Sequence, residues 1–234
     1  MWFPGHSRPD ADREAGSAVV LVLAGILLLS AFGVATLLLA TADTLASANQ
    51  RDARAILFAA EAGLELAAAE LAADPDWNSV LSGAATSAFA DGPPSGRRAH
   101  PGGGAIDLEE IASLATCGVV TGCSPAARQA VTDERPWGPN NPDWKPYRYG
   151  PISAGGTAPD TYVVVLVGDD QAEDDADPGR DGLAPGSAGA GVVMLRAEAF
   201  GPALSRRSVE AVMMRITAPG GVSAPRFLSW REVR

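Results

Sequence analysis

The sequence is poor in basic residues and in side chains that bind metals. Its 234 residues contain 18 Lys and Arg against 28 Asp and Glu, which gives a formal net charge of −10. Nucleic-acid binding requires clustered Lys and Arg to neutralise phosphates, and no basic stripe is present, so we do not expect a nucleic-acid partner. The two histidines, His6 and His100, lie far apart, and with only two cysteines, Cys117 and Cys123, a Cys/His metal site is not supported.

A catalytic constellation is also lacking. The segment 186–189 (GSAG) does not have the strand-to-helix context of a nucleophile elbow. His100 lies in a stretch of Gly and Pro around which no triad geometry is predictable. We therefore expect a structural or binding protein that is not an enzyme and requires no cofactor.

One long segment carries no charge at all. Residues 17–41 (SAVVLVLAGILLLSAFGVATLLLAT) contain no ionisable side chain over 25 positions, and about 20 helical residues suffice to cross a bilayer core. In lipid such a segment is expected to be helical, because the backbone finds hydrogen-bond partners only within itself. The alternative is a secretory signal peptide with its cleavage site at Ala46-Ser47-Ala48. The apolar region of a signal peptide, however, is usually only about 7–15 residues long.

The helix is expected to continue well past the apolar span. Residues 42–73 are rich in Ala, Leu, Glu and Arg and contain no proline, and the next proline is Pro75, so the helix should run from Ser17 to Ala73. In this second half, an apolar stripe is predicted to face a sheet while Arg51, Arg54, Glu61 and Glu65 face water. The stripe consists of Ile56, Ala59, Ala60, Gly63, Leu66 and Ala67.

The N-terminal third of the chain resembles the N-terminal region of PilX-type minor pilins. The resemblance is carried by a polar leader ending in glycine (REAG, 13–16), the small residue Ser17, the apolar span, and NQRDARAILFAAEAGLELAAAEL at 49–71. It implies cleavage by a prepilin peptidase between Gly16 and Ser17. The C-terminal Ser-Trp-Arg (229–231) extends the resemblance to the other end of the chain.

The resemblance implies a pilin-like α+β fold and a structural role. Residues 1–16 would be a cytoplasmic leader, 17–41 the transmembrane half of the helix, 42–73 its amphipathic extracytoplasmic half, and 74–234 a head with irregular loops and an antiparallel sheet. The subunit would sit in the bacterial inner membrane as a single-pass protein with its head in the periplasm, and at the cell surface or in a pilus after assembly. Its partners would be membrane lipid, the peptidase and other pilin subunits, and the small residues Ala59, Ala60 and Gly63 would let helices approach closely. A bulky residue at Gly63 is therefore expected to impair assembly without unfolding the head.

One position departs from the family pattern. Major pilins usually carry a glutamate as the fifth residue of the mature chain, whereas this sequence has Leu21 there. An uncompensated carboxylate is costly in lipid, so Leu21 eases residence as a monomer and favours an initiating or tip-located subunit. Two alternatives stay open: a type II secretion pseudopilin, and a free single-pass protein whose head binds a ligand or calcium.

The head is expected to change character along its length. Residues 74–160 should be largely irregular, with one short helix at 106–115 that begins near Asp107. Three antiparallel strands are predicted at 161–167, 191–200 and 208–217, with 201–205 as a hairpin loop and 225–234 as an added edge strand. The helix is expected to cover one side of this sheet. The facing side chains would be Val193, Leu195, Ala197 and Ala199 in one strand and Val212, Met214 and Ile216 in another.

An acidic segment at 168–182 (GDDQAEDDADPGRDG) holds seven carboxylates and a single base, Arg180. Calcium takes six to eight oxygen ligands from flexible loops, although this spacing does not match an EF-hand. The competing interpretation is a solvated acidic loop kept open by its own repulsion. The candidate calcium ligands are Asp169, Asp170, Asp174, Asp175, Asp177 and Asp181.

Two further features depend on the head lying outside the cytoplasm. Cys117 and Cys123 enclose a short flexible loop, and an even cysteine count in an oxidising compartment favours a disulfide between them. Four aromatic residues lie among prolines at 135–151 and form either a recognition surface or a cover for the edge of the sheet. They are Trp137, Trp144, Tyr147 and Tyr149.

Overall fold

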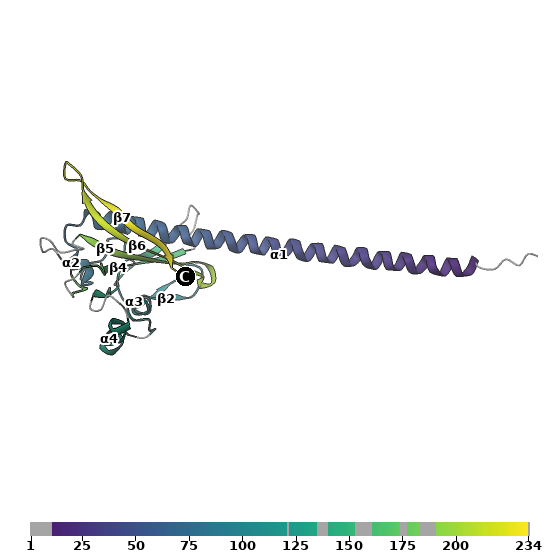
Figure 1. Cartoon of the computed structure of the whole chain (residues 1–234), viewed down its shortest axis with the longest axis horizontal. Helices are drawn as coiled ribbons and strands as arrows, with labels where there is room; N and C mark the ends of the chain where they lie inside the picture. The colour runs from purple at the N-terminus through teal and green to yellow at the C-terminus, as the bar shows by residue number, and fades with distance from the viewer. Residues whose placement is uncertain are drawn as a thin grey trace, which may run out of the picture. The chain divides into compact units, whose positions relative to one another are not determined.

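The structure is a computed structural model that describes residues 11–120, 122–134, 140–152, 161–173, 177–182 and 191–233 (Figure 1). The chain divides into two compact units, Met1–Arg51 and Asp52–Arg234. The elements in chain order are α1 (Ala11–Ala73), α2 (Asn78–Leu81), β1 (Arg97–Ala99), β2 (Ala105–Asp107), α3 (Leu108–Cys117), α4 (Pro125–Glu134), β3 (Lys145–Ile152), β4 (Thr161–Asp169), β5 (Val192–Phe200), η2 (Pro202–Leu204), β6 (Arg206–Thr217) and β7 (Ser223–Val233).

Helix α1 ends where the sequence predicts and begins earlier. It starts at Ala11 and not at Ser17, because the polar leader residues are helix formers and a single glycine at position 16 costs only about 1 kcal/mol relative to alanine. At the other end Pro75 stops the helix, and nearby donors satisfy its last carbonyl groups. The backbone N–H of Asp74 donates to Leu71 O at 3.1 Å, and Nε1 of Trp77 donates to the same oxygen at 2.7 Å. The predicted end at Ala73 is confirmed.

A five-stranded antiparallel sheet forms the centre of the second unit, in the order β3-β4-β5-β6-β7. The predicted strands, including the C-terminal edge strand, are confirmed to within two residues at each end. The predicted hairpin loop at 201–205 joins β5 to β6 and contains η2. Strand β4 is buried along its whole length, which explains its continuous apolar run: a central strand with both faces covered has no polar side.

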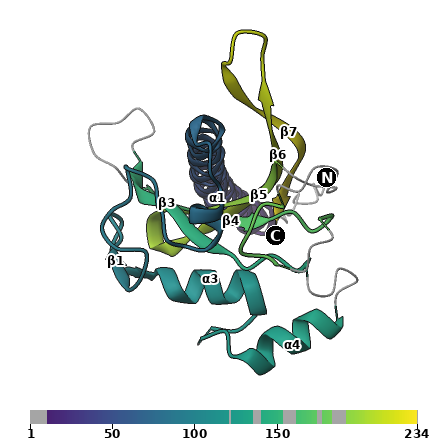
Figure 2. The same cartoon turned by 90° about the vertical axis from the view of Figure 1, so that its left-hand side faces the viewer.

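Both faces of the sheet are covered, which corrects the expectation of a single covered side. Residues 52–73 of α1 lie on one face, and α3 lies on the other (Figure 2). Helix α3 contributes Leu108, Ile111 and Ala115 to a second core cluster that contains Val164 and Leu166 from β4. The sequence of α3 shows this amphipathic pattern, but the pattern alone does not say which surface the helix covers.

The prediction of which side of β6 faces α1 was wrong. Val193 and Leu195 of β5 face α1 as predicted, and their cross-strand partners are Met213 and Ala211. The predicted residues Val212, Met214 and Ile216 point to the opposite face, where Ile216 is 39% exposed. Strand β6 carries apolar side chains on both faces, and only the register with β5 decides between them.

The buried stripe of α1 agrees with the prediction except at one leucine. Ile56, Ala59, Ala60, Gly63 and Ala67 are buried, and Arg51, Arg54 and Glu65 are exposed, as expected, while Glu61 is half-buried. Leu66 is 48% exposed, whereas Leu64 is fully buried. At about 100° per residue, Leu64 and Leu66 lie roughly 80° to opposite sides of the line of Ile56, and the sheet covers only the side of Leu64.

Residues 74–160 are more regular than predicted. The expected short helix is present as α3, and Asp107 is its N-cap: Oδ1 accepts from the N–H of Glu109 at 3.0 Å and of Glu110 at 3.3 Å. Helix α4 and strand β3 were not predicted. Strand β3 contains Pro146 and Pro151, which a central strand would not tolerate, but β3 is the edge of the sheet and has an irregular register between Pro146 and Arg148.

Candidate functional site

The apolar segment of α1 is the most distinctive surface of the first unit. Between Val19 and Leu39 its large hydrophobic side chains are 54–74% exposed. Over an 18-residue window within Gly16–Ala73 the mean hydropathy is 2.7, and no residue of that window is buried. A helix that is apolar on all sides requires lipid or other apolar helices around it. This helix is therefore compatible with a single-pass membrane anchor, although a secretory signal shares the same properties.

The two threonine hydroxyls of this segment are satisfied within the helix. The Thr36 hydroxyl donates to Gly33 O at 2.9 Å, and the Thr41 hydroxyl donates to Leu38 O at 2.8 Å. Such bonds to the preceding turn hide the hydroxyl from lipid. The threonines therefore add little to the cost of placing the segment in a bilayer.

The candidate processing site lies on exposed backbone near the start of this helix. Gly16 is exposed, and a Cβ atom added there would meet no atom within 4 Å. Packing within the described residues therefore does not explain the glycine. Leu21, the fifth residue after the candidate cleavage point, is 71% exposed.

The small residues of the second half of α1 are used inside the head. Ala59 and Ala60 are buried in the cluster formed with the sheet, and a Cβ atom at Gly63 would lie 2.6 Å from Cγ1 of Val163. Because a larger side chain would clash with the sheet, we now expect a bulky residue at Gly63 to destabilise the head, unlike the expectation from the sequence. These three residues serve the close approach of α1 to its own sheet, and they are not exposed for contact with a neighbouring helix.

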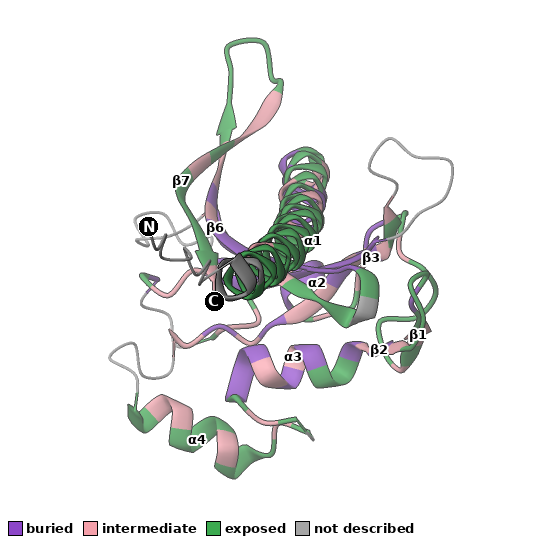
Figure 3. Cartoon of the chain, turned by 90° about the vertical axis from the view of Figure 1, so that its right-hand side faces the viewer, coloured by how far each residue is buried: buried purple, intermediate pink, exposed green. Residues whose placement is uncertain are grey.

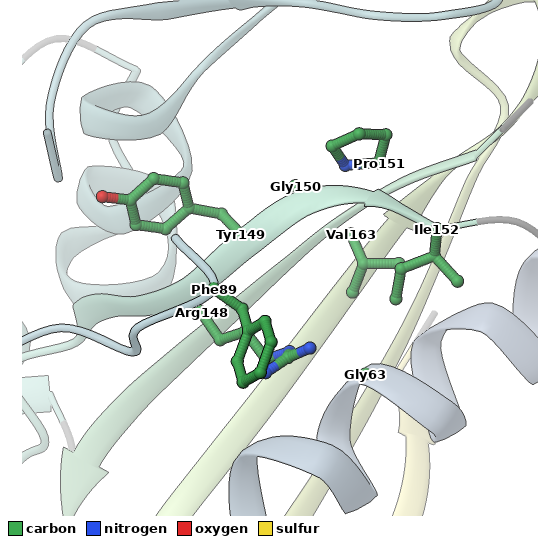
Figure 4. A pocket seen from close by; sticks show the side chains of 8 residues that line it. All are labelled: Gly63, Phe89, Arg148, Tyr149, Gly150, Pro151, Ile152 and Val163. Atoms are coloured by element: carbon green, nitrogen blue, oxygen red, sulfur yellow. The ribbon is translucent and has the colours of Figure 1, made fainter. Parts of the chain in front are cut away.

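A small cavity lies between this helix and strand β3 (Figure 4). Its volume is about 40 Å³, which is room for a few water molecules and too little for an organic ligand. At its rim the exposed ring of Phe89 lies 4.6 Å from the Arg148 guanidinium. Arg148 is also ion-paired to Glu70 of α1, and Glu70 accepts a hydrogen bond from the Ser87 hydroxyl at 2.5 Å. The polar contacts thus fasten α1 to the edge of the sheet.

The aromatic residues near β3 are part of the core. Trp144, Tyr147 and Tyr149 are each at most 5% exposed, so the covering role is confirmed for these three, and Trp137 lies outside the described residues. Tyr149 donates to Gly92 O at 2.7 Å, and Tyr162 donates to Asp91 Oδ2 at 3.2 Å.

Burial shifts the ionisation of these tyrosines. Burial raises the pKa of Tyr147 to about 12, and the carboxylates of Glu70 and Asp74 act in the same direction. Burial, assisted by Asp91, also raises the pKa of Tyr162. For Tyr149 burial raises the pKa against the opposing charge of Arg98. All three rings are therefore held in the neutral form by the fold.

Two carboxylates of the candidate calcium loop accept hydrogen bonds from backbone N–H groups. Asp181 Oδ1 accepts from the N–H of Gly191 at 2.7 Å, and Asp177 Oδ1 accepts from the N–H of Gly179 at 3.2 Å. Asp169 is buried at the end of β4, Asp170 follows it, and Asp174 and Asp175 lie outside the described residues. Within the part of the chain that the structure describes, no group of three or more His, Cys, Asp or Glu is placed to hold a metal. Calcium binding by this loop stays a prediction.

Two buried glutamates form a charged network that the sequence analysis missed. Glu198 of β5 is 2% exposed and pairs with Arg196 at 3.0 Å and Arg206 at 3.3 Å. Glu210 of β6 pairs with Arg231 of β7 at 2.5 Å and with Arg196 at 3.7 Å. The i, i+2 spacing of Arg196 and Glu198 within a strand was the available signal, because it places both side chains on one face. Part of this network lines a hollow of about 390 Å³ that also includes Trp144 and Met194.

The predicted disulfide is present. Cys117, the last residue of α3, is bonded to Cys123, and their Cα atoms are 5.8 Å apart. Gly118 caps α3 in the left-handed conformation with φ 69°. Beyond the bridge, Ser124 Oγ accepts from the N–H of Ala127 at 3.2 Å in the first turn of α4. The disulfide thus joins the end of one helix to the approach to the next.

His100 has a structural position. It is 5% exposed, its Nε2 lies 2.8 Å from Phe200 O, and its Nδ1 accepts from the N–H of Gly102 at 2.9 Å. Since Nδ1 is an acceptor, Nε2 carries the proton and donates to Phe200 O. The ring thereby ties the β1–β2 hairpin to the end of β5.

Comparison with known proteins found no match to this chain among protein-family models, curated proteins or solved structures.

Proposed function

We propose that this chain is a minor pilin-type subunit that takes part in type IV pilus assembly as an initiating or tip-located subunit. In this proposal a prepilin peptidase cuts between Gly16 and Ser17, and the apolar half of α1 holds the subunit in the inner membrane with its head in the periplasm. The subunit then associates with other pilin subunits, and its head reaches the cell surface or the pilus. The role is structural and involves no catalysis.

The observation that carries the proposal is the double use of one helix. Helix α1 runs without interruption from Ala11 to Ala73. Its apolar first part is unburied, whereas residues from Ile56 onward supply one side of the main core cluster of the head. A helix that serves both as an apolar anchor and as a core element of the head suits a subunit that is stored in a membrane and later packed beside other helices.

Two features near the N-terminus support the assignment of the processing site. Gly16 has no packing role among the described residues, and the polar stretch 10–15 ends at this glycine. Leu21 replaces the carboxylate that a shaft subunit of this type would use to pair with a neighbouring amino terminus. An apolar residue there removes the cost of a buried charge in lipid, which suits a subunit that does not repeat along the filament.

Leu21 also fits an alternative in which the protein is not a filament subunit. A free single-pass membrane protein with a ligand- or calcium-binding head needs no carboxylate at position 21 and no processing at Gly16. A type II secretion pseudopilin would share the processing step and differ only in the filament that it joins.

The test is the N-terminal residue and intact mass of the membrane-extracted protein, from cells with and without prepilin peptidase. We expect a start at Ser17 only when the peptidase is present, and an uncut chain for Gly16→Leu, with Gly25→Leu in the apolar span as the matched control. A start at Met1 in both strains would favour the single-pass alternative, and a start near Asn49 would identify a secretory signal. If the chain is processed, the partners that co-purify with it distinguish the two remaining hypotheses. Type IV pilin subunits would support the minor pilin, and type II secretion pseudopilins would support the pseudopilin.

A further inference from the structure

Helix α4 is weakly attached to the head. None of its residues is buried (Figure 3), and only Ala127, Val131 and Thr132 are half-buried. Apolar burial is the main source of helix docking energy in proteins. Helix α4 therefore has little to hold it in place through its own side chains.

Two connections at the start of α4 compensate for this weak packing. The Cys117–Cys123 disulfide fixes the approach to α4 against the end of α3. In the next turn, Arg128 Nη1 pairs with Asp143 Oδ2 at 2.6 Å, and the Arg128 side chain is 45% exposed. An ion pair with a solvent-exposed partner contributes little to stability. The covalent bridge is thus the stronger of the two.

Helix α3 does not depend on the bridge in the same way. Leu108, Ile111 and Ala115 anchor it in the core against the sheet, and Asp107 caps its first turn. Cutting the disulfide leaves these contacts in place. The effect of reduction is then confined to the segment beyond Cys117, as expected for a local unit of low stability.

We propose that the Cys117–Cys123 disulfide is a redox-sensitive latch that holds α4 on the head and releases it on reduction. A dithiol supplies the two electrons: one of its thiolates attacks a cysteine sulfur and displaces the other as a thiolate, and its second thiol resolves the mixed disulfide. The products are two cysteine thiols and the oxidised dithiol, with both protons coming from the dithiol.

Release of α4 also changes the surface beneath it. A hollow of about 300 Å³ lies beside α4. Cys123 and Arg128 line it from the α4 segment, and Leu108 and Trp144 of the second core cluster line it from the rest of the head. Without that wall, apolar side chains of the second core cluster become accessible. The oxidised and reduced chains therefore present different surfaces at this end of the head.

The test is hydrogen–deuterium exchange of the full chain in detergent micelles, oxidised and after complete reduction by dithiothreitol verified by mass. Reduction is expected to raise exchange in residues 125–134 by about tenfold or more while β4 changes by less than about twofold. Unchanged exchange in α4, or equal acceleration in β4, would overturn the latch.

Two variants separate the bridge from its neighbours. Cys117→Ser/Cys123→Ser is expected to reproduce the reduced pattern without any reductant, and protection of α4 in that variant would contradict the proposal. Oxidised Arg128→Gln, with the bridge intact, is expected to keep α4 protected. If this variant alone accelerates exchange in α4 as much as reduction does, the ion pair is the latch and the proposal fails.

Discussion

A Cβ atom at Gly63 would lie 2.6 Å from Cγ1 of Val163, so α1 approaches β4 more closely than any side-chain-bearing residue permits. The glycine is therefore required by the contact between the helix and its own sheet. The neighbouring residue, Ala62, is exposed and takes no part in this contact.

Substitution at this contact is expected to destabilise the head. Gly63→Ala should lower the free energy of unfolding by about 1–3 kcal/mol, because the overpacking outweighs the better helix propensity of alanine. The measurement is urea unfolding in detergent micelles. Adding Val163→Ala should recover part of the loss, whereas Ala62→Leu should change stability by less than about 0.5 kcal/mol. Equal effects of Gly63→Ala and Ala62→Leu would show that the close approach is not formed.

Two leucines within one turn of α1 distinguish its buried face from its exposed side. Leu64 is fully buried and Leu66 is 48% exposed. Leu64→Ala should cost about 2–5 kcal/mol of unfolding free energy, since it leaves a cavity against the sheet. Leu66→Ala should cost less than about 1 kcal/mol. Denaturant midpoints of the two variants check the difference, and a larger loss at Leu66 would contradict the orientation of the helix.

Removing the charge of the buried glutamate of β5 is expected to lower the stability of the head more than removing the charge of an exposed glutamate. Glu198 is 2% exposed and faces two arginines. Glu198→Gln should lower stability by about 1–3 kcal/mol, because half-buried Arg196 loses its closest counter-charge and keeps only the longer pair with Glu210. Glu232 pairs with Arg207 at 3.5 Å and its side chain is 36% exposed, so Glu232→Gln should cost less than about 1 kcal/mol. Thermal unfolding of both variants provides the comparison.

Alkaline pH is expected to destabilise the head through its tyrosines. Free tyrosine loses its proton near pH 10, while Tyr147 keeps it to about 12. Between these values the folded state binds more protons than the unfolded state, so the free energy of unfolding falls as pH rises. The contribution is fully present below pH 10.

The tyrosines can be followed separately from other groups at alkaline pH. All three tyrosines of the chain have a raised pKa, and Lys145 is the single lysine that could titrate in the same range. Tyrosinate absorbance should appear near pH 10 in urea and at higher pH in the folded protein. In Tyr147→Phe the loss of stability between about pH 10 and 12 should be smaller than in the wild type. An identical pH dependence would show that Tyr147 is not held neutral by the fold.

Acidic pH acts through a different group. Burial tends to raise the pKa of Asp143, but hydrogen bonds from Arg128 and Lys145 and their charges outweigh it, so the pKa lies below its ordinary value. The stabilising contribution is present above the unfolded pKa and is lost as pH falls through the folded one. Asp143→Asn should therefore be less stable than the wild type near pH 6 and should differ little from it near pH 2, as urea unfolding at the two pH values checks.

Local sequence determined the elements whose signals are strong and self-contained. The uncharged run 17–41 and the absence of proline between Ser17 and Pro75 determine a helix that ends at Ala73. The β-branched run in β4, the alternation in β5 and β6, and the cap at Asp107 follow equally from nearest neighbours. The disulfide also follows, because only two cysteines are present and they are close in sequence.

Tertiary structure alone decided what each surface packs against. The inward side of β6 depends on its register with β5, since apolar residues occupy both faces. Strand β3 exists in a proline-rich segment because it is an edge strand, which the segment itself does not reveal. The role of Gly63 could not be predicted either: a small residue on a helix permits close approach, but only the position of Val163 shows that its own sheet is what approaches.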